Sequence, residues 1–186
     1  MLVFKFGGAS VKDAAGVTNL AHIVKKYDGQ QLLIVVSAMG KMTNALERLT
    51  KAYVDQSDDL DSIYAEIKEY HNNILKDLFE PSHPVFNDVA NTFVEIDWMI
   101  EDEPHDDYDF IYDQIVSIGE LVSTRIVAAY LNQSSIKTQW LDARGYVHTD
   151  NNYREGNVYW DKTKVSISQD IPALLDKGII VTQGFL

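Results

Sequence analysis

The sequence predicts an α/β protein with parallel strands, and two observations carry this prediction. An apolar run at residues 2–6 is followed by a helical pattern and by a second apolar run at 31–37, so strand, helix and strand succeed one another within about 30 residues. The second run is continuous rather than alternating, which is typical of a parallel strand covered on both faces. Parallel strands joined by a crossover helix form a βαβ unit, which is right-handed in nearly all proteins.

The first two strands flank one amphipathic helix. Residues 2–6 are apolar, β-branched or aromatic, and we expect them to form a buried strand that enters a tight turn. Between residues 13 and 27 the apolar side chains recur at intervals of three or four, which predicts a helix that ends at Asp28 and Gly29.

A long helical excursion follows the second strand. Helical patterns run from about residue 43 to 131, including 60–79 and 111–131, and they are divided by Pro81, Pro84 and Pro104. We expect these helices to stand beside the sheet. Extended segments return at 136–141 and 146–148, followed by a helix at about 162–176 and a last apolar strand at 179–182.

No linker, repeat or low-complexity tract divides the chain, so one domain is expected. Its 186 residues, 46% of them apolar, can bury one substantial core. The sequence stops directly after a central-looking strand, with Phe185 and Leu186 at its end. We expect it to continue in the parent protein, because domains usually end on a polar tail or a docked element.

Composition narrows the possible partners and the compartment. The net charge of −12, from 16 basic and 28 acidic side chains, disfavours a nucleic-acid partner. We found no secretory pattern and no apolar run of the roughly 18 to 20 residues needed to span a bilayer, so we expect a cytoplasmic protein without a membrane partner. The absence of cysteine fits this expectation and removes disulfides and thiolate chemistry.

The first candidate motif is Lys5-Phe6-Gly7-Gly8. A lysine at the end of a strand, glycines that let backbone N–H groups approach a ligand, and a following helix start can together hold phosphate oxygens. The spacing is not that of a Walker loop, since the lysine precedes the glycines. The alternative is a plain strand-end turn with an outward lysine.

The second candidate motif closes the second strand with Ser37 and Gly40 and opens the next helix with Thr43 and Asn44. Ligands of parallel sheets bind beyond the carboxyl ends of the strands, so this motif would face the same crevice as the first. The alternative is that the hydroxyl groups only cap the helix.

The third candidate is Gly119-Glu120, inside an otherwise apolar helical stretch. Glycine in a helix interior costs about 1 kcal/mol relative to alanine, so it indicates a close backbone approach or a helix break. A carboxylate among apolar neighbours needs a cation, a hydrogen-bond donor or water. The alternative is an outward-facing Glu120 that pairs with Arg125 or with nothing.

We assign no metal site. The acidic segment at residues 101–109 surrounds a proline and predicts a solvated loop between helices. The five histidines show no metal-ligand spacing.

Taken together, the motifs resemble the aspartokinase branch of the amino-acid kinase family. The similarity lies in four stretches, in the family's order and spacing: Lys5-Phe6-Gly7-Gly8 with Ser10-Val11, Val35-Val36-Ser37-Ala38-Met39-Gly40 with Thr43-Asn44, Ser117-Ile118-Gly119-Glu120 with Ser123, and Val181-Thr182-Gln183-Gly184-Phe185. This resemblance implies a three-layer α/β/α sandwich around a mostly parallel sheet. It also implies that residues 1–186 are the amino-terminal, substrate-binding part of the kinase domain, with ATP bound mainly by the part that follows.

The resemblance also implies roles for individual residues. Lys5 would be the catalytic cation that neutralises the transferring phosphoryl group, and Phe6, Gly7 and Gly8 would complete the phosphate- and nucleotide-binding segment. Substrate binding would fall to three further residues, with Glu120 meeting the α-ammonium group of aspartate: Ser37, Thr43 and Glu120.

The implied reaction is transfer of the ATP γ-phosphoryl group to the side-chain carboxylate of L-aspartate, giving 4-phospho-L-aspartate for lysine, threonine and methionine biosynthesis. Magnesium would arrive with ATP, and no tightly bound cofactor is expected. The carboxylate, with a reference pKa near 3.9, is already ionised at neutral pH, so the reaction needs charge neutralisation and alignment rather than a base. The full-length parent is expected to be a homo-oligomer.

Two departures from the family pattern affect these expectations. Ala9 stands where the family usually has threonine, which removes one hydroxyl group from the first loop. The family's later glycine-rich segment and its regulatory ACT modules are absent, so we expect the isolated chain to lack robust kinase activity.

Three alternatives remain at this stage. Another amino-acid kinase, acting on acetylglutamate or glutamate, is disfavoured by Gly119-Glu120 and Thr43-Asn44. A non-catalytic aspartate-binding or assembly module would keep the same half of the fold. A dinucleotide-dependent oxidoreductase would need a GxGxxG motif that the chain lacks.

Overall fold

The computed structural model describes residues 1–185 and contains one parallel sheet with helices on both faces. The strands are β1 (Leu2–Phe6), β2 (Leu32–Val36), β3 (Thr138–Trp140) and β4 (Ile179–Thr182). The α-helices are α1 (Ala14–Lys25), α2 (Met42–Val54), α3 (Leu60–Leu78), α4 (Val85–Glu101), α5 (Tyr108–Gln133) and α6 (Trp160–Leu175). Short 3-10 turns, η1 (Gly8–Val11) and η2 (Ala143–Gly145), follow β1 and β3.

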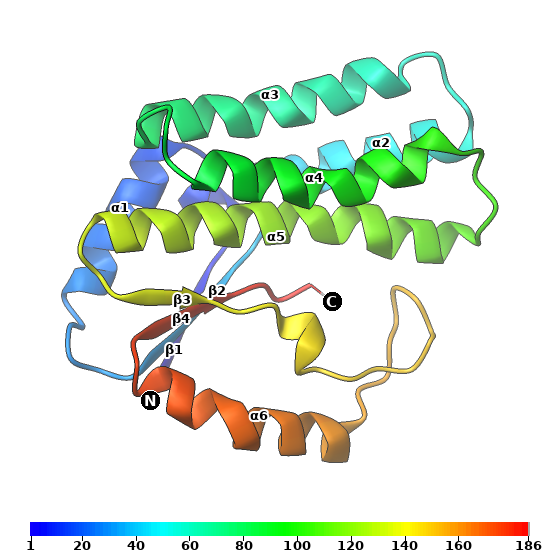
Figure 1. Cartoon of the computed structure of the whole chain (residues 1–186). Coiled ribbons are helices and arrows are strands. Elements are labelled where there is room, and N and C mark those ends of the chain that lie inside the picture. The colour runs from blue at the N-terminus through cyan, green and yellow to red at the C-terminus, as the bar shows by residue number, and fades with distance from the viewer. Residues whose placement is uncertain (186) are drawn as a thin grey trace.

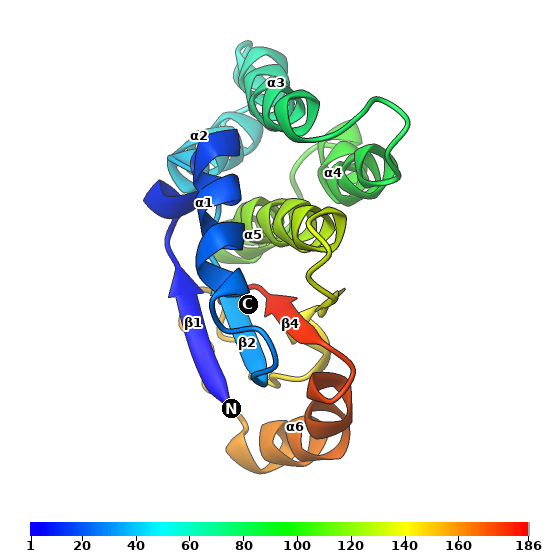
Figure 2. The same ribbon diagram turned by 90° about the vertical axis from the view of Figure 1, so that its left-hand side faces the viewer.

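The strand order is β1-β2-β4-β3, and all neighbours are parallel. The chain therefore passes from β2 to the far edge and returns to insert β4 between β2 and β3. A right-handed crossover in the reverse direction must lie on the opposite face, and this places α6 across the sheet from α1 and α5 (Figures 1 and 2). The predicted α/β/α arrangement is confirmed. All four carboxyl ends lie at one edge of the sheet.

The predicted excursion forms a thick helical layer. Helix α5 lies nearest the sheet, and α2, α3 and α4 stack outside it (Figure 1). Buried side chains occur all round α5, including Ile115, Ile118 and Leu121. By length and composition α5 could also cross a membrane, but 72% of its most apolar window is buried inside this molecule, as in the central helix of a folded core.

The prediction that β1 is a buried strand is wrong. β1 is an edge strand whose side chains alternate between partly buried and exposed, and Val3 is 57% exposed. Val3 and Lys5 alternate with Phe4 and Phe6, which pack into the core on the other face of the sheet. On the face of Val3 and Lys5, the apolar cluster of α6 reaches β4 and Leu33 of β2, and no residue of β1 belongs to it. β2 shows the same asymmetry: Ile34 is fully buried, whereas Leu33 and Val35 on the other face are only partly buried.

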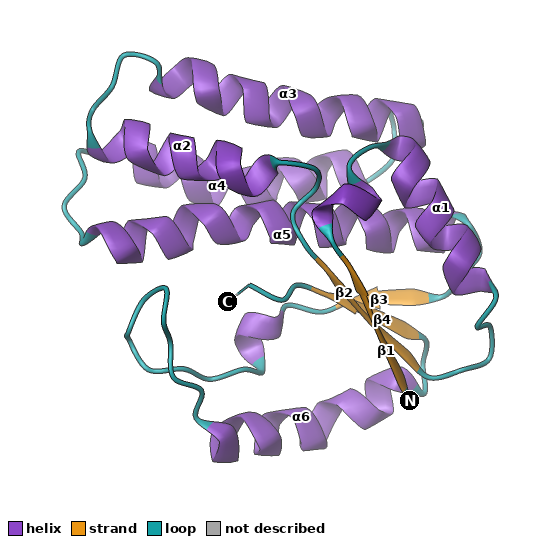
Figure 3. Cartoon of the chain, turned by 180° about the vertical axis from the view of Figure 1, so that it is seen from behind, coloured by secondary structure: helices purple, strands orange, loops and turns teal. Residues whose placement is uncertain are grey.

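The extended segment predicted at 146–148 is not a strand. This region belongs to a loop between η2 and α6, closed by one antiparallel bridge between Thr149 and Val158 (Figure 3). Asp150 holds the loop together by accepting hydrogen bonds from the backbone N–H groups of Asn152 and Asn157 at 3.2 and 2.9 Å. Two backbone hydrogen bonds also flank the bridge, from the Asp150 N–H group to the Asn157 carbonyl at 3.1 Å and from the Tyr159 N–H group to the His148 carbonyl at 2.8 Å.

Candidate active site

The loops after β1 and β2 are joined at the carboxyl edge of the sheet. The Ser37 N–H group donates to the Phe6 carbonyl, and the Gly40 N–H group donates to the Gly8 carbonyl, both at 3.0 Å. A Cβ atom on Gly8 would lie 2.5 Å from the Ala38 carbonyl oxygen, so glycine is required by close packing. The space beside Gly7 is open, which leaves that side of the turn accessible to a ligand.

Lys5 lies next to this turn, paired across the sheet with Val35. Its side chain is exposed and, within residues 1–185, forms no salt bridge. The amine is therefore available to an anionic group at the carboxyl edge. A lysine in this position suits a phosphate, because its ammonium group is a mobile point charge on a flexible stem.

Gly119 brings α5 close to the loop after β2. A Cβ atom at this position would lie 2.7 Å from Cδ1 of Leu46 and 3.0 Å from Cβ of Ala38. Helix α5 continues through Gly119 without interruption. Of the two interpretations of this glycine, close approach is confirmed and a helix break is wrong.

Glu120 is half-buried and is held by the backbone that follows β4. Its Oε2 atom accepts hydrogen bonds from the N–H groups of Gly184 and Phe185, both at 2.7 Å. Ser123, one turn later on α5, donates to the Ser37 carbonyl at 2.9 Å. These contacts join α5 to the loops after β2 and β4. The other carboxylate oxygen of Glu120, Oε1, accepts no hydrogen bond from the described residues.

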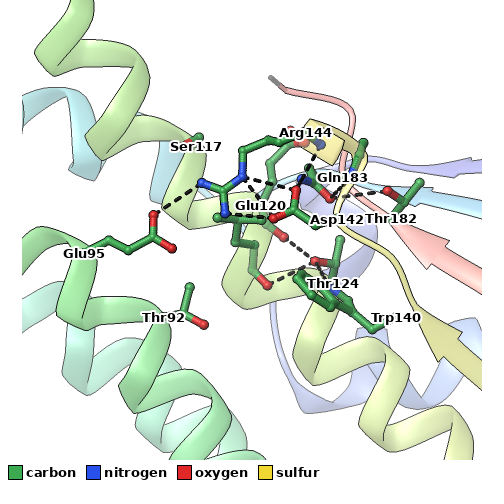
Figure 4. Close-up of polar contacts among 12 residues, drawn as sticks. Thr92, Glu95, Ser117, Glu120, Thr124, Trp140, Asp142, Arg144, Thr182 and Gln183 are labelled. Atoms are coloured by element: carbon green, nitrogen blue, oxygen red, sulfur yellow. Dashed lines mark hydrogen bonds and ion pairs between the residues drawn. The ribbon is translucent and has the colours of Figure 1, made fainter. Parts of the chain in front are cut away.

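Glu120 does not pair with Arg125, so that alternative is wrong. The Arg125 guanidinium stacks on the Trp140 ring at 3.8 Å, and burial lowers the pKa of this arginine. The Trp140 indole N–H group donates to Oγ1 of Thr124 at 2.9 Å (Figure 4). Arg125 therefore packs α5 against β3 rather than neutralising Glu120.

A second polar cluster lies beside Glu120 and had no role in the sequence prediction. The Arg144 guanidinium donates to Oδ2 of Asp142 through Nε at 3.0 Å and Nη2 at 2.8 Å (Figure 4). Oδ1 of Asp142 accepts a hydrogen bond from Nε2 of Gln183 at 2.6 Å. Burial opposes ionisation of Asp142, but these donors outweigh burial and lower its pKa. The sequence signal was an aspartate and an arginine two residues apart, directly after β3.

A cleft of about 390 Å³ opens next to Phe185 and Gly184. Helix α5 contributes Asp113 and Ser117 to its wall, on the same helical face as Glu120, and the loop after β3 contributes most of the rest. Burial raises the pKa of Asp113, although the Arg154 N–H group donates to its Oδ2 atom at 2.7 Å. The cleft adjoins Glu120 through Gly184 and Phe185, whose N–H groups hold its carboxylate, but Ser37, Thr43 and Glu120 are not among the residues that line it.

The structure places the other two predicted substrate residues differently. The backbone of Ser37 is joined to α5 through Ser123, so Ser37 belongs to the same edge as Glu120. Thr43 lies exposed in the first turn of α2, and no hydrogen bond links it to Glu120 within residues 1–185. It does not cap α2 either, because Lys41 holds the N-cap position and makes no side-chain capping bond.

The acidic segment predicted as a loop lies almost wholly between the end of α4 at Glu101 and the start of α5 at Tyr108. Across the part of the chain that the structure describes, no three histidine, aspartate or glutamate side chains are grouped so that they could hold a metal ion.

Comparison with known proteins agrees with this geometry. The model of the amino acid kinase family matches residues 1–186. Aspartokinase 1 of Arabidopsis thaliana is 33% identical over 99% of the chain and 33% of its own length. Lysine-sensitive aspartokinase 3 of Escherichia coli is 29% identical over 100% of the chain and 40% of its own length.

Solved structures give the same result. E. coli aspartokinase III in complex with aspartate and ADP superposes with a TM-score of 0.88 at 25% identity, covering 98% of the chain and 40% of that protein. Aspartate kinase of Clostridium acetobutylicum, at 20% identity and a TM-score of 0.75, shares the fold. The chain spans about a third to two-fifths of the length of these relatives. By sequence and fold, the chain belongs to the amino acid kinase family, and the relatives named here are aspartokinases.

Proposed function

We propose that the chain is the aspartate-binding part of an aspartate kinase. The observation that carries this proposal is the carboxylate of Glu120, which the backbone fixes through Oε2 at the carboxyl edge while Oε1 has no protein donor in the described chain. A fixed carboxylate of this kind suits the α-ammonium group of an amino acid. A solved relative in complex with aspartate and ADP supports the same substrate pair.

In the proposed reaction, an oxygen of the substrate's side-chain carboxylate attacks the γ-phosphorus of ATP. The bond between that phosphorus and the bridging oxygen breaks, ADP leaves, and aspartyl phosphate forms. Lys5 would neutralise charge on the transferring group, beside the open face of Gly7. ATP would bring magnesium with it as part of the substrate.

Residues 1–186 would supply the amino-acid site, and the rest of the parent enzyme would supply most of the nucleotide site. Kinase activity is therefore proposed for the parent enzyme and not for this chain alone. Glu120 also separates aspartate from N-acetylglutamate, because the acetylated nitrogen carries no charge to offset the carboxylate.

Calorimetric titration with L-aspartate tests the amino-acid site. Aspartate should bind, and Glu120→Gln should weaken its binding by roughly 10- to 100-fold. This factor corresponds to the loss of about 1.5–3 kcal/mol, the usual contribution of a hydrogen bond to a charged group. Glu66→Gln, which changes an exposed glutamate paired with Arg48, serves as the control and should leave binding unchanged. Binding of aspartate that is indifferent to Glu120→Gln would contradict the assigned role.

The reaction is tested in the full-length parent by trapping acyl phosphate with hydroxylamine. ATP-dependent product should form with L-aspartate and not with N-acetylglutamate. A folded parent that shows no aspartate-dependent transfer would overturn the proposed activity.

A further inference from the structure

We propose that Gln183 and Asp142 are positioning residues that fix Glu120 toward the substrate's ammonium group. This inference rests on the proposed function for the substrate's identity. Its structural part can be tested without any ligand. This part is the coupling between the Gln183 side chain and the anchor of Glu120, by which we mean the N–H groups of Gly184 and Phe185 that bind its carboxylate.

Gln183 is buried immediately after β4, with 2% of its surface exposed. Its Nε2 atom donates to Oδ1 of Asp142 at 2.6 Å, and its Oε1 atom accepts from the Ala143 N–H group and the Thr182 hydroxyl, each at 3.3 Å. Both ends of the amide are therefore used. A buried amide held at both ends fixes the direction in which the main chain leaves β4.

The main chain leaving Gln183 provides the two donors that hold Glu120. The N–H groups of Gly184 and Phe185, the next two residues, both bind Oε2 of Glu120. Gly184 also packs closely against β2, since a Cβ atom on it would lie 3.0 Å from Cγ1 of Val35. Rotation of the loop would thus move both donors together and carry the glutamate with them.

Asp142 is the fixed point of this arrangement. Arg144 clamps its carboxylate and reaches Oε2 of Glu95 on α4 through Nη1 at 3.3 Å (Figure 4). The cluster therefore extends from α4 through the turn after β3 to the loop after β4. One aspartate, held by an arginine, links the helical layer to the anchor of Glu120.

The test compares Gln183→Ala with Gln139→Ala. Gln139 is a partly buried glutamine on β3 whose side chain donates to the Leu174 carbonyl on α6, and it serves as the matched control. Amide hydrogen exchange by NMR reads the anchor directly. In Gln183→Ala, exchange at Gly184 and Phe185 should accelerate by about tenfold, the value of one hydrogen bond, while Gln139→Ala leaves it unchanged.

Ligand binding gives the second readout. Gln183→Ala should weaken the binding of aspartate by about tenfold. It should change the affinity for succinate, which lacks the ammonium group, by less than about twofold. In a Glu120→Gln background, Gln183→Ala should change aspartate affinity less than twofold, because the two residues act through one contact. Asp142→Leu, which is close in size and removes the acceptor of the Gln183 Nε2–H group, should show the same pattern if Gln183→Ala does not fold.

The outcomes separate the two proposals. Unchanged exchange at Gly184 and Phe185 in a folded variant overturns the positioning role, and so does equal weakening of aspartate and succinate. A third outcome is possible: exchange at Gly184 and Phe185 accelerates in Gln183→Ala, but neither the chain nor the parent enzyme binds aspartate. That outcome supports the coupling between Gln183 and Glu120 and overturns the proposed substrate.

Discussion

At the scale of single residues, two adjacent glycines experience opposite constraints. Gly8 faces backbone oxygens of Ala38 and Gly40 at 2.5 and 2.8 Å from its missing Cβ atom, whereas Gly7 faces open space. Backbone atoms cannot move aside as a flexible side-chain end can. The sequence shows two identical residues, but their steric requirements differ.

We therefore predict that Gly8→Ala destabilises the chain by about 1–3 kcal/mol, the usual cost of overpacking. Gly7→Ala should remain within about 0.5 kcal/mol, because its φ of −76° suits alanine. Urea unfolding of both variants measures the difference. Equal stability of the two variants would show that the loops after β1 and β2 are not in contact.

At the scale of elements, α3 packs against α4 through a fully buried histidine. The Nδ1–H group of His71 donates to the Ile67 carbonyl at 2.8 Å, and the ring lies edge-on to Phe93 with centroids 5.6 Å apart. Its Nε2 atom has no hydrogen-bond partner among residues 1–185. Burial lowers the pKa of His71 to about 4, so the ring is neutral at pH 7.

This burial makes the stability of the chain depend on pH. The unfolded chain binds a proton on His71 near pH 6.5, whereas the folded chain binds it only near pH 4. The stabilising contribution is therefore present above pH 6.5 and is lost as the pH falls from 6.5 toward 4.

We predict that the difference in unfolding free energy between the chain and its His71→Leu variant shifts by about 2 kcal/mol in favour of the variant from pH 7 to pH 5. Denaturant titrations at the two pH values provide the measurement. His22→Leu, which changes an exposed histidine on α1, is the control and should show no comparable shift. A pH-independent difference for His71→Leu would mean that the ring is accessible to water.

At the scale of the whole molecule, the two helical layers differ in how much they bury. Helix α5 has fully buried side chains along its length, whereas α6 buries only Thr163, Ile171 and Leu175 and contains Pro172. Exposed apolar side chains on α6 include Trp160 and Val165. The sheet is therefore supported unequally on its two faces.

We predict that α6 opens before the rest of the fold. Backbone amides of α6 should exchange at least tenfold faster than those of the central turns of α5, since local stability follows buried apolar contact. Hydrogen exchange followed by mass spectrometry measures this directly. Equal protection of α5 and α6 would show that α6 belongs to the same cooperative unit.

Much of the architecture followed from local patterns. Periodic apolar spacing predicted α3 and α5 to within a few residues, and continuous apolar runs predicted β2 and β4. The status of β1 as an edge strand did not follow, because its composition matches that of a covered strand. Burial depends on which elements lie alongside, which the sequence of one strand does not contain.

The candidate site divides in the same way. The sequence by itself determined the fold class, the family resemblance and the residue types at the strand ends, since glycine, lysine and glutamate each have a local signature. Only the tertiary structure decided that Glu120 is held by Gly184 and Phe185 and that Gln183 meets Asp142. Those partners are separated by 41 to 65 positions in the chain, and only the return of β4 between β2 and β3 brings them together.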